Sequence, residues 1–396
     1  MKVLILSDFD SRLKWGLSYA FFLKKYYEIT IYCKEKKLSQ FQNYYLDEYN
    51  ILKYNNLIYL LQQNNIFLDY DLIFLSLGGG ENIKFFYYLN QFYDKYQTRP
   101  LVVAGMNGLT DSNDIHALLC RIGADFICIN SLENLKNFKK KMSLLELSNK
   151  NLFYSGYGRL YNQSKIFYNN EIKTILFIEQ PSIPKYIKQR KYLVEKIIEY
   201  ANRYPLRKII IKKRAILHKQ YMNAHLKDDT IFDFFIKHSI KIPDNLSFND
   251  SSIEELMYEA DLCVSFYSTA IIEAIALGIR SVIIKDFGIG RSNENHHFIG
   301  SGLLISLNEW IEDKIPNVNQ EWKKNNCKLI DENVVLSLKN LIEKLKFSKI
   351  RKANVFYKEK DFPYFYNFLY RQNKIKNFIR ECTSFFHRFF KKSKIV

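Results

Sequence analysis

The stretch SFYSTAIIEAIALGIRSVII, residues 265–284, contains the pattern that decides the fold. Apolar residues 262–266 predict a short buried strand, and residues 270–277 are good helix formers that end at a glycine. Residues 281–284 then return to a β-rich pattern. A strand, a turn, a helix and a second strand in this order are typical of neighbouring parallel strands joined by a crossover helix.

The turn Tyr267-Ser268-Thr269 lies at the amino end of the predicted helix. The first turn of a helix has backbone N–H groups without intrahelical partners, and it carries the positive end of the helix dipole. The hydroxyls of Ser268 and Thr269 can cap these groups, or the turn can bind an anion there. The turn alone is compatible with either role.

Strand and helix patterns alternate along most of the chain, and the pattern restarts near residue 173. It predicts an α/β protein with two doubly wound, Rossmann-like domains that face each other across a cleft. We expect the first domain over 1–160, the second over 161–345, and crossover helices with a tail over 346–396. The predicted strands are 2–7, 28–33, 71–77, 100–104 and 124–130 in the first half, and 173–178, 208–212, 262–266 and 281–284 in the second.

The 396 residues include 59 Lys and Arg against 41 Asp and Glu, and this difference of 18 favours anionic partners. Nucleotides, phospholipids and nucleic acid all satisfy that preference. The aromatic content, with 29 Tyr and 31 Phe, also motivates a nucleic-acid-binding protein, but no recognised nucleic-acid module is present. Nucleic-acid or anionic-surface binding therefore stays as an alternative from another class, and we expect no nucleic-acid partner.

The six cysteines are scattered without a C-x-x-C pair, which fits a reducing compartment. The opening MKVLILSDFD reaches acidic residues too early for a signal peptide, and no apolar run approaches the roughly 18 residues of a spanning helix. His296 and His297 are adjacent, but no third ligand stands at metal-site spacing. The sequence predicts a cytoplasmic protein that needs no metal and no cofactor.

The segment 374–394 has an amphipathic pattern that differs from the rest of the chain. Its Phe-rich stripe lies opposite a Lys/Arg face at helical spacing, which is the pattern of a helix in a membrane interface. The alternative is a terminal helix packed on the protein's own core. We expect the segment to bind the anionic inner face of the cytoplasmic membrane.

Three strand ends of the second half are expected to meet at one edge of the sheet, because parallel strands place their carboxyl ends together. Cations and a helix N-terminus at such an edge favour a phosphate-bearing ligand. Glu273, one helical turn beyond Thr269, can reach a ribose hydroxyl or remain an exposed helix acid. The residues expected to bind the donor are Gln180, Lys212, Arg214, Ser265, Ser268, Thr269 and Glu273.

The first half is expected to supply the second substrate and a general base. The segment DFDSRLKWG after the first strand is expected to form a turn that leads into a helix. A base must lie within hydrogen-bond reach of the hydroxyl that it deprotonates. The candidates for the base are Asp10, Glu81, Asp114 and His116, and the residues expected to face the cleft are Ser11, Lys14, Gly79, Gly80 and Asn107.

Six blocks of the sequence, found in order over most of residues 1–305, resemble one family of bacterial glycosyltransferases that occurs with surface-polysaccharide genes. The resemblance implies the GT-B fold, a nucleotide-sugar donor, and transfer to a hydroxyl of a capsule or lipopolysaccharide glycan or a lipid-linked acceptor. A UDP-sugar transferase and a nucleotide-sugar epimerase on the same fold are the alternatives. The six blocks are SDFDSRLKWG, GADFICIN, FIEQPSIP, KKRAI, SFYSTAIIEA and DFGIG with FIGSGLL.

The second half is also similar to that of GT-B transferases that use CMP-activated sialic or other nonulosonic acids. That resemblance implies a phosphate site at the basic element and at the Ser268–Thr269 turn, with Asp10 as the base of a metal-independent direct displacement. The basic element of this chain continues with Arg214-Ala215, where those transferases have a His-Pro pair. This departure bears on the identity of the donor sugar.

Overall fold

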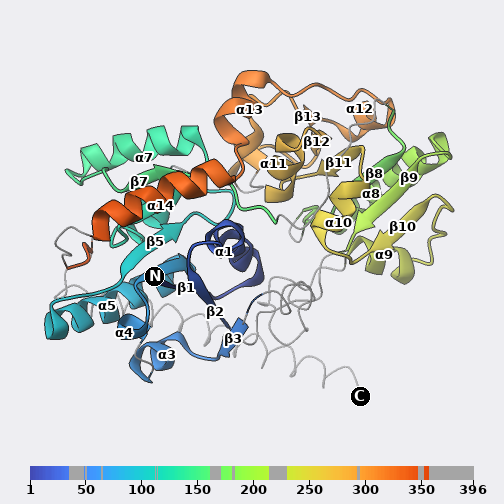
Figure 1. Ribbon diagram of the computed structural model, residues 1–396. Coiled ribbons are helices and arrows are strands. Elements are labelled where there is room, and N and C mark those ends of the chain that lie inside the picture. The colour runs from blue at the N-terminus through green and yellow to red at the C-terminus, as the bar shows by residue number, and fades with distance from the viewer. Residues whose placement is uncertain are drawn as a thin grey trace, which may run out of the picture.

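The computed structural model contains two parallel β-sheets with helices on both faces of each (Figure 1). The sheets have seven and six strands, and every strand pair is parallel. The predicted α/β architecture with two Rossmann-like units is confirmed. The structure describes residues 1–34, 49, 51–63, 66–111, 113, 115–160, 171–180, 183–213, 230–291, 295–346 and 352–355.

The first sheet, in the order β3-β2-β1-β4-β5-β6-β7, has β1 near its centre. One face packs against α3 to α7, and the other packs against α1 and α14. The strands are β1 Lys2–Ser7, β2 Glu28–Lys34, β3 Ile51–Tyr54, β4 Leu72–Ser76, β5 Leu101–Gly105, β6 Phe126–Ile129 and β7 Leu152–Tyr154. The helices are α1 Asp10–Leu23, α3 Leu57–Gln63, α4 Ile66–Asp69, α5 Gly79–Tyr96, α6 Ile115–Leu119 and α7 Leu132–Leu144.

The second sheet, in the order β10-β9-β8-β11-β12-β13, has β8 and β11 at its centre. Helices α8, α9 and α12 cover one face, and α10, α11 and α13 cover the other. The strands are β8 Thr174–Ile178, β9 Lys208–Lys212, β10 Leu246–Asn249, β11 Leu262–Ser265, β12 Arg280–Ile284 and β13 Leu304–Ile305. The helices are α8 Ile187–Arg203, α9 Ile231–Lys237, α10 Ile253–Glu259, α11 Thr269–Ala276, η3 Asn295–Phe298, α12 Leu307–Ile311 and α13 Gln320–Asn326.

Helix α14, Glu332–Lys346, returns to the first half of the molecule (Figure 1). Its apolar side chains Val334, Leu338 and Ile342 are buried in the same core cluster as strand β1. From the sequence, we expected residues up to 345 to belong to the second domain. The apolar face of α14 is instead buried against the first sheet, because that sheet has an apolar surface beside α1 left to cover.

Two further features differ from the sequence-based expectation. The segment DFDSRLKWG is mostly helical rather than a turn, since α1 already begins at Asp10. Strands β3, β7, β10 and β13 were not predicted, because they lack the continuous buried run that identifies the equally short β6 and β11. Among the described helices, none is long and apolar enough to cross a membrane. The segment 374–394 lies outside the described residues.

Candidate active site

The ends of β8, β9 and β11 lie side by side, as the sequence predicted, because these strands are neighbours in a parallel sheet. The Ser265 hydroxyl donates to Ile178 O at 2.9 Å and to Tyr267 O at 3.2 Å, and it accepts from Gln180 Nε2 at 3.4 Å. Ser265 is fully buried. It therefore holds the ends of β8 and β11 together rather than facing a ligand.

The Ser268–Thr269 turn has two different polar roles. Ser268 is the N-cap of α11, and its hydroxyl accepts from Ala270 N at 3.1 Å. Thr269 Oγ1 accepts from Leu109 N of the first half at 3.3 Å. The capping role considered from the sequence is thus present, and the second hydroxyl joins the helix end to the loop that follows β5.

Lys14 of α1 forms a buried ion cluster with two glutamates of the second half. Its ammonium lies 2.6 Å from Glu254 Oε1 and 2.6 and 2.7 Å from the two carboxylate oxygens of Glu273. Burial lowers the pKa of Lys14, but the two carboxylates outweigh it and raise that pKa overall. Burial raises the pKa of Glu273, and Lys14 opposes this shift. Both carboxylate oxygens of Glu273 therefore accept from Lys14, and Glu273 is a buried residue and not an exposed acid of the helix.

The Lys212 side chain lies at the opposite side of β9 from the α11 turn. Its Nζ donates to Lys213 O at 2.9 Å and to Asp250 O, just after β10, at 3.2 Å. Burial lowers the pKa of Lys212. The structure thus directs this ammonium to backbone carbonyls between β9 and β10, and Arg214 lies outside the described residues.

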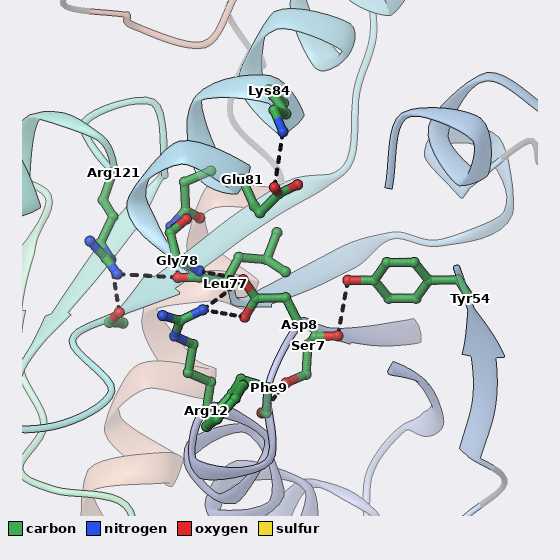
Figure 2. Close-up of polar contacts among 12 residues, drawn as sticks. Ser7, Asp8, Phe9, Arg12, Tyr54, Leu77, Gly78, Glu81, Lys84 and Arg121 are labelled. Atoms are coloured by element: carbon green, nitrogen blue, oxygen red, sulfur yellow. Dashed lines mark hydrogen bonds and ion pairs between the residues drawn. The ribbon is translucent and has the colours of Figure 1, made fainter. Parts of the chain in front are cut away.

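The carboxyl edge of the first sheet contains an aspartate that the sequence analysis did not select. Asp8 is buried, accepts from Arg12 Nη1 at 2.6 Å with both oxygens, and accepts from Gly78 N at 3.0 Å (Figure 2). The signal for this pair was present in the sequence as an i, i+4 spacing. Asp10, two residues later, is the first residue of α1, and Asp114 lies outside the described residues.

The buried guanidinium of Arg121 lies at the same edge of the sheet. Figure 2 shows it beside Leu77, and it donates to the carbonyl oxygens of Leu77, Gly105 and Ala117 at 3.2, 2.9 and 2.6 Å. Burial lowers the pKa of Arg121 to about 10. The guanidinium satisfies carbonyls at the ends of β4 and β5, so it stabilises the edge from inside.

The other predicted residues of the first half lie at different places on this edge. Glu81 pairs with Lys84 at 2.9 Å within α5, and the exposed His116 ring lies 3.6 Å from Cys120 Sγ. Gly79 and Gly80 are the first residues of α5 rather than a loop. Ser11 is exposed in the first turn of α1. These residues do not form one cluster with Lys14.

A second contact between the halves involves Asp111, which follows β5 after six residues. Asp111 Oδ2 lies 3.2 Å from Arg291 Nε and 3.6 Å from His296 Nε2. We call the whole contact region the junction; its residues are Lys14, Asn107, Leu109 and Asp111 of the first half and Glu254, Thr269, Glu273, Arg291 and His296 of the second. Within the described ranges, no three His, Cys, Asp or Glu side chains gather as a metal site, so the His296–His297 pair has no third ligand there.

Two facing α/β units with a helix N-terminus at the junction define the GT-B architecture. The family model described as "Putative glycosyltransferase (DUF6716)" matches residues 3–333. The chain belongs to that family, and the expectation of a GT-B glycosyltransferase is confirmed at this level. Among curated proteins, none matches the chain in a sequence comparison.

Solved structures of nucleotide-sugar enzymes are similar over nearly the whole chain. The S. aureus MnaA–UDP co-structure has a TM-score of 0.61 at 11% identity and covers 90% of this chain and 99% of that chain. A Listeria monocytogenes structure described as a putative UDP-N-acetylglucosamine 2-epimerase has a TM-score of 0.59 at 9% identity, with the same 90% and 99% coverage. The Methanocaldococcus jannaschii UDP-GlcNAc 2-epimerase with UDP-GlcNAc and UDP has 0.57 at 13%, covering 87% and 100%. At these identities the similarity establishes the fold.

Proposed function

We propose that this protein transfers a sugar from a nucleotide-activated donor to a hydroxyl of a surface glycan or lipid-linked acceptor. The observation that carries the proposal is the amino end of α11, which lies at the junction with Thr269 in contact with the first half. The positive end of the helix dipole and the N–H groups of a first helical turn stabilise a leaving phosphate at such a place. We assign the donor to the second half and the acceptor to the first.

The proposed reaction is a direct displacement at the anomeric carbon. The acceptor hydroxyl attacks as a carboxylate removes its proton, the bond from the anomeric carbon to the phosphate oxygen breaks, and the nucleotide leaves. We assign the base to Asp10, which lies one helical turn before Lys14 in α1 and so at the side of the molecule that meets α11. The positive helix end then stabilises the leaving phosphate without a metal.

The nucleotide is proposed to be CMP-linked, on the resemblance to nonulosonic-acid transferases. Structural relatives carry UDP or UDP-GlcNAc in their names, so a UDP-sugar is the matched alternative. An epimerase on the same fold is the alternative reaction. It would convert a nucleotide-sugar without any acceptor, so a product assay with and without acceptor glycan distinguishes epimerisation from transfer.

The first experiment is thermal shift with CMP, UDP, GDP and ADP on wild type, Ser268→Ala and Ser306→Ala. Both serines are helix N-caps in the second half, and their hydroxyls accept from Ala270 N and Glu309 N. Each substitution lowers stability by about 1 kcal/mol through the lost cap. Only Ser268→Ala should also lose the shift caused by the preferred nucleotide. A wild-type protein that none of the four nucleotides stabilises would contradict the proposal.

A third variant, Lys212→Met, tests the role of the basic element. Lys212 bonds to backbone carbonyls, so nucleotide binding that survives this substitution limits the phosphate site to the α11 turn. Loss of binding extends the site to β9.

We also propose that the segment 374–394 attaches the enzyme to the inner face of the cytoplasmic membrane. Its support is the amphipathic sequence pattern with one basic and one Phe-rich face. Co-sedimentation of the full chain with phosphatidylglycerol vesicles, but not with phosphatidylcholine vesicles, is the expected result. A protein that sediments with neither kind of vesicle would exclude this attachment.

A further inference from the structure

Two half-buried side chains at the junction have polar atoms that are shielded from solvent and form no hydrogen bond. Asn107 follows β5, and within the described part of the chain neither its Nδ2 nor its Oδ1 has a partner. The same holds for both ring nitrogens of His296 in η3. Buried polar groups are almost always paired, because an unpaired one loses its bonds to water without compensation. Unsatisfied polar atoms on two side chains of the same contact region therefore suggest that a ligand binds there.

The short stretch 107–111 connects these two side chains across the junction. Leu109 N donates to Thr269 Oγ1 at 3.3 Å, and a Cβ on Gly108 would lie 3.3 Å from the same oxygen. Four residues after Asn107, Asp111 Oδ2 lies 3.6 Å from His296 Nε2. The stretch therefore runs from the amino end of α11 to η3, with the Asn107 amide at its first residue and the His296 ring beside its last, and neither side chain forms a hydrogen bond.

The chemistry of these groups selects the ligand. A carboxamide offers one acceptor oxygen and two donor hydrogens, and an imidazole offers two ring nitrogens that donate or accept according to tautomer and protonation. A phosphate would satisfy only the donors, and the nearby Asp111 carboxylate would repel it. Hydroxyl groups both donate and accept, so a polyhydroxylated sugar satisfies the amide, the ring and the aspartate together.

The geometry points to Asn107 and His296 as the residues that hold the sugar of the donor. This assignment rests on the proposed function, in which the donor phosphate lies at the amino end of α11. The sugar is bonded to that phosphate, and the stretch 107–111 is in direct contact with Thr269 at that end. The unpaired state of both side chains then belongs to the ligand-free enzyme, and sugar hydroxyls complete their hydrogen bonds.

The test is calorimetric titration with paired probes: UDP against UDP-N-acetylglucosamine, and CMP against CMP-N-acetylneuraminate. The measured quantity is the ratio of the Kd of the nucleotide to the Kd of its sugar derivative. In Asn107→Leu and in His296→Phe, which keep the side-chain size, this ratio should fall about tenfold for the preferred pair. The Kd of the nucleotide alone should stay within about twofold, because the phosphate site is untouched.

A melting-temperature measurement without ligand separates this role from a structural one. Asn107→Leu removes an amide that has no partner, so the Tm should stay equal or rise. The control is Asn245→Leu, whose amide donates to Ala201 O, Tyr204 O and Arg207 O away from the junction. That variant should lose Tm and keep the wild-type Kd ratio.

Three outcomes decide the assignment. A fall of the ratio in both junction variants, with no loss of Tm in Asn107→Leu, supports it. A ratio equal to that of wild type in both variants, for every pair that binds, overturns the sugar site and leaves the proposed function standing. A wild type that binds none of the four probes, and that none of CMP, UDP, GDP and ADP stabilises, overturns the proposed function, and this assignment with it.

Discussion

Buried carboxylates at the carboxyl edges of the two sheets obtain their cationic partners in different ways. In the first sheet, Asp8 is satisfied by Arg12 and by Gly78 N, all within the same half. In the second half, Glu254 and Glu273 obtain their cation from Lys14, which belongs to the other half. Asp8 therefore has its cation within its own half, whereas Glu254 and Glu273 have theirs only when the halves are docked. A site at the junction thus depends on the docking of the two halves.

Lys14→Met is the substitution expected to break this comparison with the largest effect. Both glutamates would remain buried without the Lys14 ammonium that lies against them, and removing one partner of a buried ion pair costs about 3–5 kcal/mol. The measurement is the free energy of unfolding in urea. Lys25→Met, in the turn just after the same helix, is the control, since Lys25 and Glu332 form an ion pair with both side chains about half exposed. Its effect should be about 0–1 kcal/mol.

A Lys14→Met, Glu273→Gln double variant sharpens the result. Removing one of the two uncompensated charges should restore part of the lost stability, because the two sites share one interaction. Equal unfolding free energies for Lys14→Met and Lys25→Met would show that the cluster does not hold the halves together.

Asp8→Asn tests the carboxylate that obtains its cation, Arg12, from its own half. Asparagine keeps an oxygen for Gly78 N but loses the charge that pairs with Arg12, so we expect a loss of about 1–2 kcal/mol. Nucleotide binding should be unchanged, because no residue of this pair contributes to the junction. An Asp8→Asn protein that unfolds like wild type but no longer binds nucleotide would show that Asp8 acts on the ligand instead.

The local parts of this structure were predictable from the sequence, and the docking of the halves was not. Strands 2–7 and 208–212 and the unit around α11 were predicted at or near their observed bounds, since buried runs and a glycine stop are local signals. The pairing of Lys14 with Glu273 joins residues 259 positions apart. No pattern along the chain specifies which helix of one half meets which helix of the other.

Side-chain direction was the second limit of the sequence analysis. Lys212 is the last residue of β9, as predicted, but its hydrogen bonds go to carbonyls that follow β9 and β10, away from the α11 turn. The neighbouring strand β10 has four residues, and without it the competing carbonyl of Asp250 could not be foreseen. The same reasoning applies to Asp8, whose partner Gly78 N comes from the end of β4.

The smallest effect is expected from His297, which stacks on His296 beside the junction with ring centroids 4.0 Å apart. Burial, and then the charge of His296, lowers the pKa of His297 to about 4 from its ordinary 6.5, and Asp111 opposes the shift. The unfolded chain therefore binds more protons between these values, so stability is complete above about pH 6.5 and falls with decreasing pH. From pH 7.5 to 5.5 the loss should be about 1 kcal/mol.

Urea unfolding at pH 7.5, 6.5 and 5.5 measures this loss, with His297→Asn against the exposed His238→Asn as control. The control should keep the wild-type dependence of the unfolding free energy on pH, and His297→Asn should weaken that dependence. Because His297 lies in η3 next to His296, which meets Asp111, saturation with the preferred nucleotide-sugar should bury His297 further and steepen the dependence of the unfolding free energy on pH. If the pH dependence is unchanged in His297→Asn, another group causes the loss of stability in acid. The comparison of the two edges then rests on the Lys14 ion cluster alone.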